Sequence, residues 1–127
     1  MAASVGMALV MGLVMIAAGM GIPVMAALNG GLGLRLGNPV AASSLLLSLA
    51  LLVSLVFTLG RPLPAAAQFA ATPPHYFMGG FFVAFYILSI TWIAPKIGIG
   101  NAIFLVLCGQ IAASALIDLH HYFWTPS

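Results

Sequence analysis

Charged side chains are almost absent from this chain, and their scarcity restricts its fold more than any other feature. Asp118 is the single acidic residue, and Arg35, Arg61 and Lys96 are the only arginine and lysine residues among 127. A water-soluble domain carries charges on about a quarter of its residues. Because the chain is also 64% hydrophobic, with a mean hydropathy of +1.24, we expect it to reside in a lipid bilayer.

Four apolar stretches, separated by the segments that hold the basic residues, predict four membrane-spanning helices. Each stretch is close to the ~20 residues with which a helix crosses ~30 Å of hydrocarbon. Strands of a membrane barrel would alternate apolar and polar side chains, and these stretches are apolar on nearly every face. No lysine or arginine precedes the first stretch, so we expect a retained span rather than a cleaved signal peptide. The predicted fold is an all-α membrane protein, a four-transmembrane-helix bundle in a single domain (1–127), with spans at about 3–28, 39–59, 76–94 and 102–117.

Proline, glycine and asparagine residues mark the expected helix boundaries. Asn38 followed by Pro39 is typical of an N-cap with proline at the first helical position. A second N-cap is predicted at Asn101, which follows a glycine before the fourth span. Pro95 is expected to end the third span, and the proline-rich segment 60–75 predicts a longer connection at the membrane surface.

Two turn segments resemble each other, since Arg35-Leu-Gly-Asn-Pro39 precedes the second span and Lys96-Ile-Gly-Ile-Gly-Asn101 precedes the fourth. They indicate two tandem helical hairpins, a construction common in transporters, although chance similarity of glycine-rich turns is the alternative. Arg35 and Lys96 fall on one face of the membrane, and Arg61 and the amino terminus fall on the other. This weak positive-inside signal allows insertion in both orientations, and hence head-to-tail pairing into an antiparallel homodimer.

Gly19, Gly21 and Pro23 lie in the second half of the first span. Proline at this position removes one backbone hydrogen bond and crowds the carbonyl of Gly19, so a kink is expected. One interpretation is a bend that helps the helix to pack. The other is a broken helix whose freed backbone groups face a substrate cavity.

Polar residues inside the spans are the candidates for a substrate cavity. Gln110 and Ser114 lie one turn apart in the fourth span, and an amide near the bilayer midplane is unfavourable unless it faces a cavity or another helix. Asn29 and Tyr86 are further polar side chains within the apolar stretches. Hydrogen bonding between helices is the structural alternative for each of them. We predict that Asn29, Tyr86, Gln110 and Ser114 line the cavity.

Asp118 follows Ser114 by one turn at the end of the fourth span, where the helix dipole opposes a carboxylate. His120 and His121 are close enough in sequence to partner it. A solvated interfacial residue is the simple interpretation, and a proton-coupling or cation-contacting group is the functional one, which makes Asp118 the coupling candidate. These histidines and His75 have no recognised ligand spacing, so no metal site is predicted.

The sequence features of enzymes and nucleic-acid-binding proteins are missing. The chain has no phosphate-binding loop with lysine, no pair of carboxylates, no serine or cysteine beside a base and no basic patch. Cys108 is the only cysteine, so no disulfide forms within one chain. We therefore predict no catalysis, no cofactor and no nucleic acid partner; the expected partners are the lipid bilayer, a small-molecule substrate and a second copy of the chain.

Short motifs, ordered along nearly the whole chain, resemble one known family. They are Pro23-Val-Met-Ala-Ala-Leu-Asn29-Gly30 with Gly37-Asn38-Pro39, then Ala94-Pro95-Lys96-Ile-Gly98, and Gly109-Gln110-Ile-Ala-Ala-Ser114 with Ile117-Asp118. In this order and spacing the chain resembles the small YdcZ-type inner-membrane proteins of the drug/metabolite transporter superfamily. The resemblance implies a half-size transporter of the bacterial inner (plasma) membrane that works as a dimer on small metabolites or drugs.

Two features depart from what the resemblance implies. Related proteins commonly continue into a fifth helix beyond the Asp118 region, whereas this sequence reaches Ser127. The first span also lacks the membrane-embedded glutamate with which related small multidrug exporters couple to protons, and neither Asn29 nor Gln110 titrates in its place. The predicted function is a secondary transporter subunit for a small organic molecule. The rival is a non-transporting structural or regulatory membrane subunit, which a closed bundle with Gln110 bonded to its neighbours would favour.

Overall fold

The computed structural model describes the backbone of residues 2–124 and the side chains of residues 4–121. Within that part of the chain, four helices are long and apolar enough to cross a membrane, which confirms the predicted all-α membrane fold. They are α1 (Ala2–Leu36), α2 (Pro39–Leu59), α4 (Gly79–Ile97) and α5 (Ile99–Trp124). The connection between α2 and α4 contains the short helix α3 (Ala66–Ala71) and the 3₁₀ turn η1 (Pro74–Phe77).

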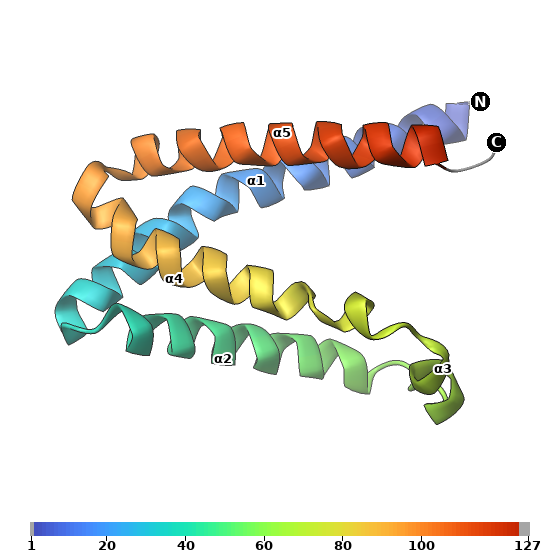
Figure 1. The fold of residues 1–127 in the computed structure, drawn as a ribbon, viewed down its shortest axis with the longest axis horizontal. Helices are drawn as coiled ribbons and strands as arrows, with labels where there is room; N and C mark the ends of the chain where they lie inside the picture. The colour runs from blue at the N-terminus through green and yellow to red at the C-terminus, as the bar shows by residue number, and fades with distance from the viewer. Residues whose placement is uncertain (1, 125–127) are drawn as a thin grey trace.

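The long helices converge at one end of the molecule and diverge toward the other (Figure 1). The turns 36–39 and 97–99 lie together at the first end, which we call the packed end. The start of α1, the end of α5 and the short helix α3 lie at the other, the open end. Helix α1 packs against α2, α4 and α5, and α4 also packs against α2 and α5. The chain thus forms two arms, with α5 and the start of α1 in one and α2 and α4 in the other.

The buried residues are concentrated at the packed end, and most of them are small. In α1 they recur every three or four residues, at Ala26, Asn29, Gly30 and Gly33, as one face of a helix does. A Cβ atom added to Gly33 would lie 3.3 Å from the Cα atom of Pro39, so glycine allows α1 and α2 to approach closely. Residues 4–21 of α1 and 107–121 of α5, by contrast, are exposed, which leaves them to lipid or to another chain.

The start of α2 is the one predicted at Asn38 and Pro39. The Oδ1 atom of Asn38 accepts a hydrogen bond of 3.0 Å from the backbone N–H of Ala41, and Pro39 is the first helical residue. Gly37 precedes the cap with a φ of 64°, in the left-handed region that glycine adopts without steric cost. This N-cap prediction is therefore confirmed.

The predicted boundaries at Pro95 and Asn101 were wrong. Helix α4 runs through Pro95 to Ile97, because a proline in the last turn costs a single backbone hydrogen bond. The turn is made instead by Gly98, with a φ of 94°, so that α5 begins at Ile99 and already includes Asn101. The amide of Asn101 donates to the carbonyl of Ile97 at 2.6 Å, and it thereby caps the end of α4 rather than the start of α5.

Helix α1 is continuous through Pro23, so the alternative of a broken helix is not observed. The kink at Gly19, Gly21 and Pro23 stays a prediction. Helices α1 and α5 also extend past the predicted spans 3–28 and 102–117. Helical hydrogen bonding continues beyond the apolar segment, and the hydropathy pattern therefore marks the span better than the helix end.

Candidate functional site

Two buried polar side chains join α1 to α4 near the packed end. Asn29 is 4% exposed and Thr91 is 2% exposed, and the Asn29 Nδ2 atom donates a hydrogen bond of 2.5 Å to the Thr91 Oγ1 atom. The residues buried nearby are apolar, with Ala26, Ile90 and Ala94 in the same region. An amide in such surroundings is stable only with a partner, so this bond fixes the crossing of the two helices.

Asn29 also lines a hollow of about 370 Å³ between α1 and α2. The other lining residues are apolar, and leucines such as Leu45 and Leu49 form the α2 wall. Asn29 therefore makes an interhelical hydrogen bond, which was the structural alternative, and it also borders a hollow. Its contact with a substrate stays a prediction.

Tyr86 lies on the side of α4 that borders α5. It packs against the small core that contains Ala26, Ile90 and Ala102, and it lines a hollow of about 150 Å³ between α4 and α5. Its hydroxyl oxygen is buried and makes no hydrogen bond within residues 4–121. A buried hydroxyl without a partner is unfavourable, and the position is suited to a ligand, a water molecule or a group of a second chain.

Gln110, Ser114 and Asp118 lie on the exposed part of α5, beyond the α5 wall of the Tyr86 hollow, which reaches only to Val106. Asn29 borders the hollow between α1 and α2, so one chain does not bring the four predicted cavity residues into a single site. Their shared role in a cavity stays a prediction. Within residues 4–121, no three His, Cys, Asp or Glu side chains gather as metal ligands would.

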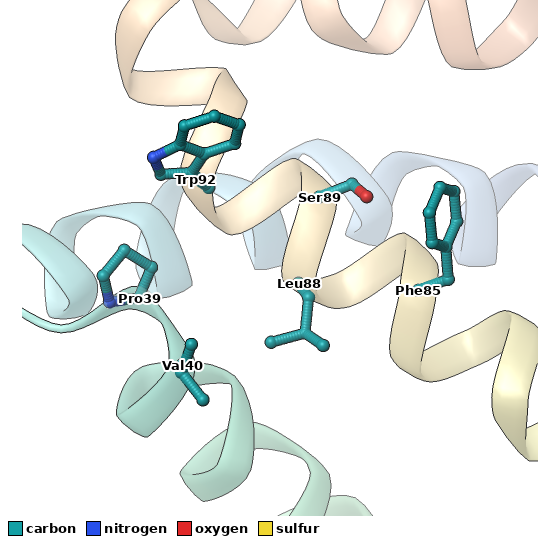
Figure 2. A pocket seen from close by; sticks show the side chains of 6 residues that line it. All are labelled: Pro39, Val40, Phe85, Leu88, Ser89 and Trp92. Carbon is teal, nitrogen blue, oxygen red and sulfur yellow. The ribbon is translucent and has the colours of Figure 1, made fainter.

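A groove of about 530 Å³ runs between α2 and α4 (Figure 2). Pro39 and Val40 form one wall, and Leu88 projects from α4 toward them. Trp92 also lines the groove, and the Lys96 Nζ atom lies 4.1 Å from the centre of the Trp92 ring, within the range of a cation–π interaction. Sequence reasoning missed this pair, although the spacing of four residues on one helix is a sufficient signal.

Thr91 was also missed as the partner of Asn29. Asn29 lies seven residues before the end of α1, and Thr91 lies six residues before the end of α4. Both helices end at the same membrane face, so the two side chains have similar depth in the bilayer. Two isolated polar residues at equal depth are therefore expected to form a pair, because polar side chains in hydrocarbon are stabilised by hydrogen bonds across helices.

Four long apolar helices with few charges define a multi-pass α-helical membrane protein. Residues 10–127 match the model of the family described as "Putative inner membrane exporter, YdcZ", so the chain belongs to this family, as its motifs indicated. It is a multi-pass protein of the inner membrane, and the family description supports a role in transport rather than catalysis. Searches of curated proteins and of solved structures found no match.

Proposed function

We propose that this chain is one half of a secondary transporter for a small organic molecule, and that two copies enclose the substrate cavity as a homodimer. The observation that carries the proposal is the position of Gln110. Its side chain is exposed near the middle of α5 and makes no hydrogen bond within residues 4–121. An amide at that depth is unfavourable in contact with lipid, so a second chain or a polar cavity is expected to cover it.

The divergence of the two arms supports the same conclusion. Residues 107–121 of α5 contact no other described helix closely enough to be covered, and the arms do not enclose a path across the membrane. A second copy, inserted in the opposite orientation, adds the missing walls and provides alternating access by symmetry. Gln110 bonded to its own neighbours would have favoured a structural or regulatory subunit, and that bonding is not observed in the described residues.

Cross-linking between copies tests the dimer. The symmetry axis of an antiparallel homodimer lies in the membrane plane, so that midplane residues of one α5 meet the same residues of the other. With Cys108→Ala as background, we expect Gln110→Cys to form a disulfide-linked dimer in membranes. The matched control is Ala112→Cys, which lies about 200° around the helix and is expected to form no cross-link. Equal cross-linking at both positions, or none at residue 110, would contradict this dimer.

Transport is tested in proteoliposomes with ethidium and with radiolabelled amino acids and nucleosides as probes. We expect wild type to move at least one of these compounds, and Gln110→Leu to lose that flux while keeping its helical content. Ala112→Leu is the matched control and is expected to retain the flux. Retained flux in Gln110→Leu would remove this residue from the cavity, and no flux in wild type would contradict the transporter proposal.

A further inference from the structure

The groove between α2 and α4 continues into a second hollow at the packed end. This end hollow has a volume of about 320 Å³ and shares Pro39 and Trp92 with the groove. It is bordered by Lys96 and, on the α1 side, by Gly30, Gly33 and Leu34. The groove below is lined by apolar residues apart from Ser89. A hollow that is bordered by one ammonium group thus opens into an apolar groove.

The dimensions match one leaflet of a bilayer. From Lys96 at the membrane face to Phe85 at the far end of the groove are eleven residues of α4, or about 16 Å along the helix axis. Half of the ~30 Å hydrocarbon core is ~15 Å. The groove therefore has the length of a single acyl chain, with its headgroup at the level of Lys96.

The charge at this end is suited to an anion. Lys96 borders the end hollow, its ammonium is held over the ring of Trp92, and Arg35 lies in the last turn of α1 at the same end. The only acidic side chain of the protein, Asp118, is near the far end of α5. Basic pockets between membrane helices bind the phosphate of anionic lipids.

We propose that the end hollow and the groove together form a binding site for one anionic phospholipid. Its phosphate lies at Lys96, and one acyl chain lies along Val40, Leu88 and Phe85. Such a lipid would fill the space between α2 and α4 and hold the two helices at a fixed separation. This inference does not depend on the proposed transport function, because no residue of α5, the helix of Gln110, lines the groove or the end hollow.

Quenching of Trp92 fluorescence tests the site. The chain has two tryptophans, so the background variant Trp124→Phe leaves Trp92 as the only reporter. We expect brominated phosphatidylglycerol in phosphatidylcholine vesicles to quench Trp92 more strongly than brominated phosphatidylcholine at the same fraction. Lys96→Gln is expected to lower this preference about fivefold, and Lys96→Arg to retain it. Arg61→Gln is the matched control, since it removes one cation at the open end, and it is expected to keep the preference.

Two further measurements complete the test. Leu88→Trp would fill the groove and, read by native mass spectrometry as lipid retained per chain, is expected to reduce bound phosphatidylglycerol. Inorganic phosphate at millimolar concentration is expected not to displace the lipid. Equal quenching by the two brominated lipids, an unchanged preference in Lys96→Gln, an equal loss in Arg61→Gln, full lipid retention in Leu88→Trp or displacement by phosphate would each overturn the proposal. Helical content measured by circular dichroism distinguishes a lost site from a misfolded variant.

Discussion

Asn29 and Thr91 join α1 to α4 by a side-chain hydrogen bond. Each is nearly inaccessible, and their hydrogen bond connects segments that are 62 residues apart in sequence. Interhelical hydrogen bonds within membranes average about 0.6 kcal/mol and reach about 1.7 kcal/mol, since the separated helices find other partners. The amide of Asn29 has few alternatives at this depth, so its bond is expected in the upper part of that range.

Thr91→Val is therefore predicted to lower the free energy of unfolding by about 1–1.7 kcal/mol, because the shape is kept and the Asn29 amide loses its acceptor. The measurement is equilibrium unfolding in mixed detergent micelles. Thr58→Val serves as the control, since the exposed Thr58 hydroxyl bonds only to the Ser54 carbonyl in its own helix. A loss of the same size in both variants would assign the effect to helix propensity rather than to the interhelical bond.

Asp118 is predicted to be the group through which a proton gradient acts on transport, since it is the sole carboxylate side chain and is exposed near the open end. Asp118→Asn keeps the size and the hydrogen-bonding ability of the residue and removes its charge. In proteoliposomes, this variant is expected to lose the acceleration of flux by an imposed pH gradient. His75→Gln, at the same membrane face, is expected to keep it. A wild-type response in Asp118→Asn would make Asp118 an ordinary interfacial residue.

Among the helices, α1 approaches its neighbours closely at two glycines. Gly30 and Gly33 face α4 and α2, and a Cβ atom on Gly30 would lie 3.2 Å from the Cγ atom of Pro95. Gly31 between them faces open space, with nothing within 4 Å of an added Cβ atom. Adjacent glycines of one helix thus have opposite tolerance for a side chain.

Gly33→Leu is predicted to destabilise the protein by about 1–3 kcal/mol, because the added side chain would meet the backbone of Pro39. Gly31→Leu is predicted to be neutral or slightly stabilising, since leucine favours a helix by up to ~1 kcal/mol over glycine. Thermal unfolding of both variants in the same detergent measures the difference. Similar melting temperatures for the two would mean that α1 and α2 do not approach as closely as their glycines allow.

Much of this element structure is predictable from local sequence. The four spans follow from hydropathy, and the start of α2 follows from Asn38 and Pro39, because the cap and the proline give the same signal. At the equivalent turn of α5 the local signals conflict: Asn101 favours a cap, while Gly98 permits the left-handed backbone that in fact makes the turn. Pro95 was misinterpreted because a proline removes one backbone hydrogen bond from the turn before it without necessarily ending the helix, as the continuation of α1 through Pro23 also shows.

The candidate site is less predictable than the helices. Tyr86 and Asn29 each border a hollow, and their predicted contact with a substrate stays a prediction. The separation of Asn29 from Gln110 depends on which helices pack together, and no local pattern specifies that packing. The role of Gln110 and Ser114 depends further on a second chain, and it remains a prediction.

For the molecule as a whole, the balance of charge between its two ends is the main determinant of orientation. Arg35 and Lys96 lie at the packed end and Arg61 lies at the open end. A difference this small provides little positive-inside bias, so we predict that the protein inserts in both orientations.

Labelling of single cysteines with an impermeant maleimide measures this orientation. With Cys108→Ala as background, Leu36→Cys at the packed end and Leu63→Cys at the open end are each expected to react from both sides of the membrane. Arg61→Gln removes the opposing charge and is expected to shift labelling of residue 36 toward the cytoplasmic side. Labelling of each cysteine from one side alone would rule out dual orientation.

Because the buried residues are concentrated at the packed end, the helices are fixed relative to one another there and are free of such contacts toward the open end. Helix α5 has 26 residues and is about 39 Å long, and only its first turns are held by other helices. A rotation of about 5° at this pivot displaces the far end by about 3 Å, while the atoms near the pivot hardly move. The Asn29–Thr91 bond lies near the packed end, so it can persist when the ends of the helices at the open end move apart or together.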